Sequence, residues 1–224
     1  MADTEGISRC FDRCACAKGR RRHPGRVRGV SQSLLALLEH QGLSGVTVLE
    51  LGCGLGGLTR DTVRRGASRA TGIDLSPESI GAATRLAAEA GLTDRVAFSV
   101  GDGARAPLEP HDVVVLDKVI CCYPQVDALL ENSLGAARRV YAFVVPLSYG
   151  WRGLAAKIAI SFANAFLRIT RQRYRAYVHD LKHVEDRIAG AAFQRVAATR
   201  RTIWFVGVYA RERGETNGRL DIAS

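Results

Sequence analysis

The stretch VLELGCGLGGLT, residues 48–59, decides the fold class of this chain of 224 residues. An apolar run ends in a cluster of glycines, and the sequence then resumes with a helical pattern. Because glycine lacks a Cβ, such a turn lets the backbone bend sharply and approach a bound molecule closely. The stretch therefore predicts either a site for a nucleotide-like cofactor, NAD or S-adenosylmethionine, or only a tight turn.

Strands and helices alternate on both sides of this stretch. Short runs of β-branched and apolar residues predict strands over 46–51, 69–74, 95–100, 112–117 and 139–145. Helical patterns lie between them, over 57–66, 76–90 and 127–137. This alternation is typical of an α/β fold with a parallel sheet and helices on both faces. Residues 195–211 predict a further pair of strands in an antiparallel hairpin.

The chain is long enough for one globular domain, which we place over residues 29–211. Residues 1–28, which carry Cys10, Cys14 and Cys16, are arginine-rich and predict a flexible basic tail. Residues 150–178 predict a lid-like helical insertion, and residues 212–224 predict a polar tail. Because no apolar run could span a membrane and no signal region is seen, we expect a cytoplasmic location and reduced cysteines.

The net charge of +10 is unevenly distributed. Residues 31–149 hold ten Lys or Arg and thirteen Asp or Glu, whereas residues 150–224 hold fourteen and six. The basic ends could bind a nucleic acid, an anionic membrane surface or an acidic small molecule. Alternatively, they could contribute only to solubility. The acidic centre agrees in sign with a cationic ligand.

Four acidic side chains favour one of the two cofactors. Asp74, at the end of the second strand, can accept hydrogen bonds from a ribose, which both cofactors carry. Glu50, Asp102 and Asp117 lie near the ends of the first, third and fourth strands, so we expect all four at one edge of the sheet. Carboxylates would repel the pyrophosphate of NAD but attract a sulfonium and an ammonium. We therefore expect S-adenosylmethionine.

Residues 30–145 resemble the class I S-adenosylmethionine-dependent methyltransferases. The segments LELGCGLGG, GIDLS, GDG and DVVVLDKV are similar to four motifs of that family. The resemblance implies a Rossmann-like fold with a seven-stranded sheet whose last strand is antiparallel. It also implies that Asp74 holds the ribose, Asp102 the adenine, and that Asp117 lies near the methionine or the acceptor. It further implies that Gly52, Gly54 and Gly56 pack on the cofactor. Together with the acidic residues discussed above, the candidate cofactor-binding residues are Glu50, Gly52, Gly54, Gly56, Asp74, Leu75, Asp102, Gly103 and Asp117.

A second resemblance concerns the methyl acceptor. The segments LDKVICCYPQ (116–125) and RYRAYVH (173–179) are similar to magnesium-protoporphyrin O-methyltransferases and their relatives. Cys122 stands where that family has a histidine. The resemblance implies O-methylation of a small molecule that is bulky, partly apolar and carries an acidic group.

Methyl transfer to a hydroxyl oxygen needs a base, and the candidates are Tyr123 and His179. Arg173 and Arg175 could clamp an acidic group of the substrate. Lys118 and Cys122, which follow the fourth strand, are further candidates for substrate binding.

The helix predicted over 151–169 is mostly apolar and is flanked by arginines. Its residues Leu154, Ile158, Phe162 and Phe166 could form a roof over a bulky apolar acceptor, which is the interpretation we favour. Alternatively, this helix could make a peripheral contact with an anionic membrane.

Two alternatives for the function remain at this point. If the tail folds over the crevice, its three cysteines could meet Cys121 and Cys122 and present a thiol or a thiol-bound metalloid as the acceptor. The basic ends could instead belong to an RNA-directed methyltransferase or to an RNA-binding module. The spacing of the cysteines is not a usual zinc pattern, so we predict no metal site.

Overall fold

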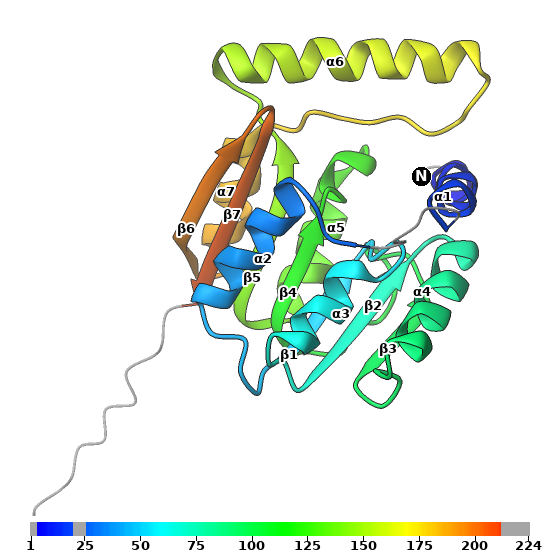
Figure 1. The fold of residues 1–224 in the computed structure, drawn as a ribbon. Helices are drawn as coiled ribbons and strands as arrows, with labels where there is room; N and C mark the ends of the chain where they lie inside the picture. The colour runs from blue at the N-terminus through cyan, green and yellow to red at the C-terminus, as the bar shows by residue number, and fades with distance from the viewer. Residues whose placement is uncertain (1–3, 20–25, 212–224) are drawn as a thin grey trace, which may run out of the picture.

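One seven-stranded sheet organises the chain, with helices on both of its faces (Figure 1). The computed structural model describes residues 4–19 and 26–211. The strands run in the order β3-β2-β1-β4-β5-β7-β6, and β7 is antiparallel to both of its neighbours. This arrangement confirms the predicted sheet. The strands are β1 Thr47–Leu51, β2 Arg69–Asp74, β3 Val96–Val100, β4 His111–Asp117, β5 Ala137–Pro146, β6 Phe193–Arg201 and β7 Trp204–Arg211.

The helices predicted over 57–66, 76–90, 127–137 and 151–169 are present, and each begins and ends within about two residues of the predicted positions. Ser76 caps the helix that follows β2: its Oγ accepts a hydrogen bond from the Ser79 backbone N–H at 2.9 Å, and Pro77 occupies the first helical position. A short 3-10 helix, Ile120–Cys122, follows β4. The helices are α1 Thr4–Gly19, α2 Val30–His40, α3 Gly57–Arg64, α4 Pro77–Glu89, α5 Val126–Gly135, α6 Gly150–Ile169 and α7 Leu181–Gly190.

The core is divided into two layers by the sheet. Successive side chains of a strand point to opposite faces, so β4 contributes Val113 and Val115 to one layer and Val114 and Leu116 to the other. All four of these side chains are buried. The continuous apolar run DVVVLD is thus explained by burial on both faces of a central strand.

Residues 4–19 form a helix, whereas the sequence predicts a flexible tail there. Ile7 and Phe11 lie one turn apart, and Phe11 meets the ring of Tyr174 edge-on at 5.5 Å between centroids. The Ser8 hydroxyl donates to the Leu75 carbonyl oxygen at 2.9 Å, and Ser76 donates to Asp12. These contacts hold α1 against the start of α4. The predicted polar tail over 212–224 lies outside the described residues.

α6 lies apart from the layers of the sheet (Figure 1). It begins directly after β5 and crosses the edge of the sheet at which the parallel strands end. Of its twenty residues, only Gly153 and Ala156 are buried. Among the helices within residues 4–19 and 26–211, none combines the length and the apolarity that crossing a bilayer requires.

Candidate active site

A cavity of about 700 Å³ lies at the carboxyl ends of β1, β2 and β4. In an open α/β sheet this edge is the usual place for a ligand crevice, and the volume is in the range of small-molecule sites. The wall brings together many of the residues predicted for the cofactor and acceptor sites. The predicted residues on the wall are Glu50, Gly52, Gly54, Asp74, Leu75, Gly103, Asp117, Lys118, Cys122 and Tyr123.

The glycines after β1 differ in their structural roles. Gly54 lies on the cavity wall with φ +52°, and a Cβ added there would meet no atom within 4 Å. Its missing side chain therefore leaves room for a ligand. A Cβ on Gly52 would lie 2.3 Å from a methyl group of Val119, so this glycine is also required for packing. Gly56 lies off the wall, and a Cβ there would strike the Phe98 ring at 2.5 Å.

Glu50 is a buried carboxyl group on the cavity wall. Its Oε2 accepts hydrogen bonds from the Thr59 backbone N–H, at 2.8 Å, and from the Thr59 hydroxyl. Burial raises the pKa of Glu50 to about 8, and the nearby carboxylates of Asp117 and Asp74 add to this rise. Glu50 is therefore mostly protonated at neutral pH until a cation lies beside it.

Asp74 is fixed by the backbone on both sides of it. One carboxylate oxygen accepts from the Gly54 N–H at 2.8 Å, and the other accepts from the Ser76 N–H at 2.9 Å. The carboxylate thus ties the glycine turn to the start of α4. Each carboxylate oxygen can accept more than one hydrogen bond, so these two contacts do not by themselves prevent Asp74 from accepting a hydrogen bond from a ligand.

Asp117 and Lys118 form a polar group on the opposite wall. The Ser31 hydroxyl donates to Asp117 Oδ2 at 2.5 Å, and Lys118 Nζ lies 2.6 Å from Ser31 Oγ and 3.3 Å from Asp117 Oδ2. Asp117 Oδ1 is buried, and no hydrogen-bond partner for it exists among the described residues. A buried carboxylate oxygen without a partner is costly, so this wall suits a ligand that donates hydrogen bonds or carries positive charge.

Asp102 does not line the cavity itself, but it accepts a hydrogen bond from a residue that does. Its Oδ1 accepts from the Tyr123 hydroxyl at 2.9 Å and from the Ala104 N–H at 3.0 Å, while Gly101 and Gly103 lie on the wall. Burial, together with the Asp102 charge, raises the pKa of the Tyr123 hydroxyl. Tyr123 is therefore a hydrogen-bond donor that orients Asp102, and a poor base at neutral pH.

His179 lies away from the cavity wall. Its Nε2 is 2.8 Å from the carbonyl oxygen of Tyr123, and burial lowers the pKa of its ring. The ring thus holds the backbone at Tyr123 in place. The structure does not bring His179 to the cavity that the other candidate residues share.

Arg173 and Arg175 line a smaller pocket next to the cavity. Arg175 Nη1 donates to the carbonyl oxygens of Gln172 and Tyr174 and so closes a local turn. Cys122 lies on the wall of both pockets, with its Sγ 3.3 Å from the Tyr174 hydroxyl. Hydrogen bonding from Cys121 lowers the pKa of the Cys122 thiol.

The expected roof over an acceptor is not formed by the apolar face of α6. Leu154, Ile158, Phe162 and Phe166 are exposed, and none of them lies on the cavity wall. The periodicity identifies an apolar stripe correctly, but it does not say which way the stripe points. Ile7 and Phe11 of α1 line the cavity instead.

Of the five cysteines in the predicted cluster, the structure describes the side chains of Cys10, Cys121 and Cys122, and Cys10 is half-buried. Cys121 and Cys122 are buried, and within the described part of the chain no group of three His, Cys, Asp or Glu side chains is placed to hold a metal ion. Cys14 and Cys16 fall on positions whose side chains lie outside the described part.

Several residues of the cavity wall are not among those that the sequence predicts: Ile7, Phe11, Arg26, Arg28 and Ser31. The four-residue spacing of Ile7 and Phe11 is a helical signal that could have found the first two. Arg26 and Arg28 precede α2, where no periodic pattern indicates what a side chain faces, and Ser31 is a polar residue in the first turn of α2.

The comparisons with known proteins agree with this geometry. The profile of a methyltransferase domain family matches residues 48–141. A probable chloroplastic tocopherol O-methyltransferase of Oryza sativa is 41% identical over 61 residues, which are 27% of this chain and 17% of that protein. The ribosomal protein L11 methyltransferase of Haemophilus ducreyi is 37% identical over 137 residues, which are 60% of this chain and 43% of that protein. The chain spans less than half the length of these curated relatives.

Among solved structures, the magnesium protoporphyrin IX methyltransferase of Synechocystis PCC 6803 with bound SAH has a TM-score of 0.72 and 20% sequence identity. The alignment covers 94% of this chain and 100% of that one, so the likeness in fold extends beyond the matched domain. Residues 48–141 thus match a methyltransferase domain, and the fold of the chain is similar to that of solved methyltransferases.

Proposed function

We propose that this chain methylates an oxygen atom of a small, bulky and partly apolar acceptor that carries an acidic group, with S-adenosylmethionine as the methyl donor. One observation carries the proposal: three carboxyl groups, Glu50, Asp74 and Asp117, surround a cavity that a glycine turn keeps open. A ligand with a sulfonium and an ammonium suits such a wall, whereas the pyrophosphate of NAD does not. S-adenosylmethionine supplies an electrophilic methyl group on its sulfonium.

The chain's own residues would act mainly by binding and positioning. Asp74, held by two backbone N–H groups, is oriented to accept from ribose hydroxyls. Asp117 has one oxygen with no hydrogen-bond partner in the described part of the chain, and Glu50 would ionise beside a cation, so both would offset the positive charges of the donor. Proximity and orientation of this kind account for much of the acceleration of bimolecular displacements.

The cavity wall also carries cationic side chains that could bind the acidic group of the acceptor. Arg26, Arg28 and Lys118 line the same cavity, so they are better placed for an acidic group than Arg173 and Arg175. Tyr123 is a poor base and His179 lies off the wall. An acceptor oxygen that is already ionised needs no base, which favours a carboxylate over an alcohol. The carboxylate would gain the methyl group and become a neutral ester.

The cofactor is tested by calorimetric titration with S-adenosylmethionine, S-adenosylhomocysteine and NAD. We expect the first two to bind and NAD not to bind. Asp74→Asn should weaken binding by about tenfold or more, because a hydrogen bond to a charged group is lost. The matched control is Asp94→Asn, an exposed residue before β3. Binding of NAD, or equal binding by the two variants, would contradict the proposal.

The acceptor is tested by incubation with S-adenosylmethionine and a panel of apolar carboxylic acids, magnesium protoporphyrin among them. Mass spectrometry should find methyl esters that mild base hydrolyses. Lys118→Met should raise KM for the acceptor by about tenfold, whereas Lys182→Met on the exposed surface of α7 should not. Methyl groups on carbon, nitrogen or alcohol oxygen would show that the proposed acceptor class is wrong.

A further inference from the structure

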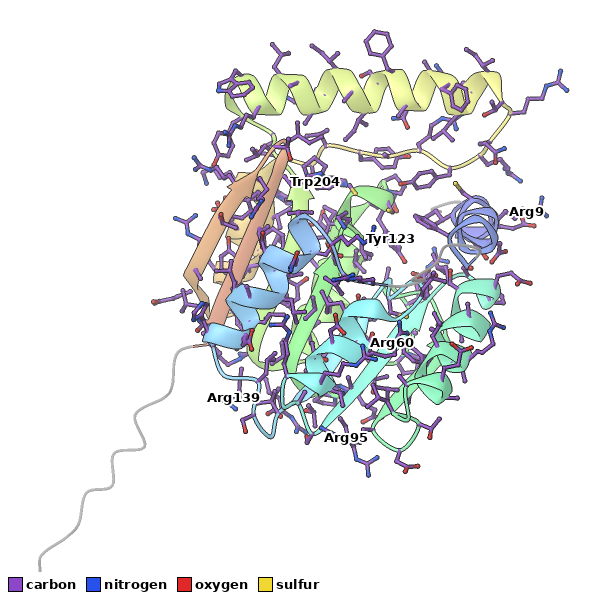
Figure 2. The ribbon with its side chains drawn as sticks, viewed as in Figure 1. Arg9, Arg60, Arg95, Tyr123, Arg139 and Trp204 are labelled. Atoms are coloured by element: carbon purple, nitrogen blue, oxygen red, sulfur yellow. The ribbon has the colours of Figure 1, made fainter. Side chains whose placement is uncertain are left out.

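The outer face of α6 is a row of large apolar side chains in contact with solvent. Trp151, Leu154, Ile158, Phe162, Phe166 and Ile169 are between 49% and 80% exposed. Their spacings of three and four residues place them on one side of the helix. Figure 2 shows side chains of α6 projecting away from the rest of the molecule. A contiguous exposed row of this kind marks an interaction surface.

The opposite side of α6 is already covered by the chain itself. Asn164 Nδ2 donates to the Ala176 carbonyl oxygen at 2.8 Å, and the Ala176 N–H donates to Asn164 Oδ1 at 2.9 Å. The segment that returns from α6 is in turn fixed to the body, where the Tyr177 N–H donates to the Cys121 carbonyl oxygen at 2.8 Å. The apolar face is therefore held outward, and nothing in the described chain folds back over it.

The charges beside the apolar row of α6 indicate which kind of partner this face would bind. Residues 150–175 hold six Lys or Arg and no Asp or Glu. Around the helix, Arg152 falls on one flank of the apolar row, and Lys157 and Arg168 fall on the other. An apolar face with cations on both flanks is the pattern of helices that lie in the interface of an anionic bilayer.

We propose that α6 binds the surface of anionic membranes, with its aromatic and aliphatic row in the interface and its cations at the lipid phosphates. A second copy of this chain fits the face less well, because two paired α6 helices would bring their cations together without acidic partners. Since α6 crosses the edge of the sheet at which the cavity lies, membrane binding would turn that edge toward the bilayer (Figure 1).

The test is flotation of the full chain with phosphatidylcholine vesicles, with and without about 30% phosphatidylglycerol, in low and high salt. We expect binding to the anionic vesicles only, reduced by salt. Phe162→Ser with Phe166→Ser should lower the bound fraction by about tenfold or more, because two apolar anchors are lost. Val196→Ser on β6, another exposed apolar residue, is the control and should bind as the unmodified chain does.

A second measurement tests the position of the helix. The fluorescence of Trp151 should shift to shorter wavelength on adding anionic vesicles, and Trp151→Phe should lose that shift while still floating with the vesicles. Failure to float, or flotation that the Phe162→Ser, Phe166→Ser variant retains, would overturn the proposal. A dimer in solution that this variant converts to a monomer would also overturn it, in favour of self-association. None of these readouts depends on a cofactor or an acceptor.

Discussion

At the scale of single residues, Glu50 makes the protein sensitive to pH. Its pKa is raised from an ordinary 4.5 to about 8, so the folded chain binds one more proton than the unfolded chain between these values. The stability of the ligand-free protein therefore falls as pH rises through this window, by up to about 1.4 kcal/mol per pH unit. Glu50→Gln keeps the acceptor for Thr59 and should remove this slope, as urea unfolding at several pH values would show.

The same group should make cofactor binding depend on pH in the opposite direction. A cation favours ionised Glu50, so the affinity for S-adenosylmethionine should rise as pH rises toward 8. Glu50→Gln resembles the protonated state, so its affinity should be flat with pH and equal to that of the unmodified chain in mild acid. Calorimetry across pH values measures both curves, with exposed Glu89→Gln as the control. An affinity of the unmodified chain that does not change with pH would contradict this role.

Substitutions at two glycines of the turn should distinguish an effect on folding stability from an effect on ligand binding. Gly52→Ala puts a Cβ 2.3 Å from Val119, so we expect a loss of stability of roughly 1–3 kcal/mol. Gly54→Ala meets no neighbouring atom and should cost only about 1 kcal/mol for its positive φ, while it places a methyl group in the cavity. Thermal unfolding and titration with S-adenosylhomocysteine should therefore rank the two variants differently. Equal stability of the two variants would contradict this division.

At the scale of elements, α1 should help to close the cavity. Phe11 lines the cavity and contacts Tyr174, which follows α6 in the chain. Phe11→Ala should weaken ligand binding by about three- to tenfold, because an aromatic pair and part of the wall are lost. Arg9→Ala on the exposed side of α1 is the control (Figure 2). Unchanged binding by Phe11→Ala in calorimetry would show that α1 does not contribute.

Elements with regular periodicity could be predicted from the sequence, and those that depend on packing could not. The alternation of strands and helices predicted β1 to β5 within two residues at each end. The central strand β4 is a continuous apolar run because it is buried on both faces. α1 was missed because Ile7 and Phe11 are the only large apolar side chains in its sequence, too few to set a helical period. The strand ends indicated where Glu50, Asp74 and Asp117 gather. The positions and roles of Tyr123 and His179 depend on tertiary contacts, which leave no pattern in the sequence.

At the scale of the whole molecule, α6 is separable from the core. The sheet and both apolar layers lie within the remaining elements, and α6 buries only Gly153 and Ala156. A variant in which a short Gly-Ser linker replaces residues 151–171 should therefore unfold cooperatively, with a midpoint within a few degrees of the unmodified chain, since little buried area is lost. Circular dichroism on heating measures this.

The same variant tests whether the two proposed surfaces are independent. Its affinity for S-adenosylhomocysteine should be unchanged, because no residue of 151–171 lies on the cavity wall, while its flotation with anionic vesicles should be lost. The variant keeps the segment after residue 171, because Tyr177 and His179 form hydrogen bonds with the backbone of the segment that carries Tyr123. If cofactor binding were lost together with flotation in a folded variant, α6 would have to support the cavity as well, and the separation of roles would be wrong.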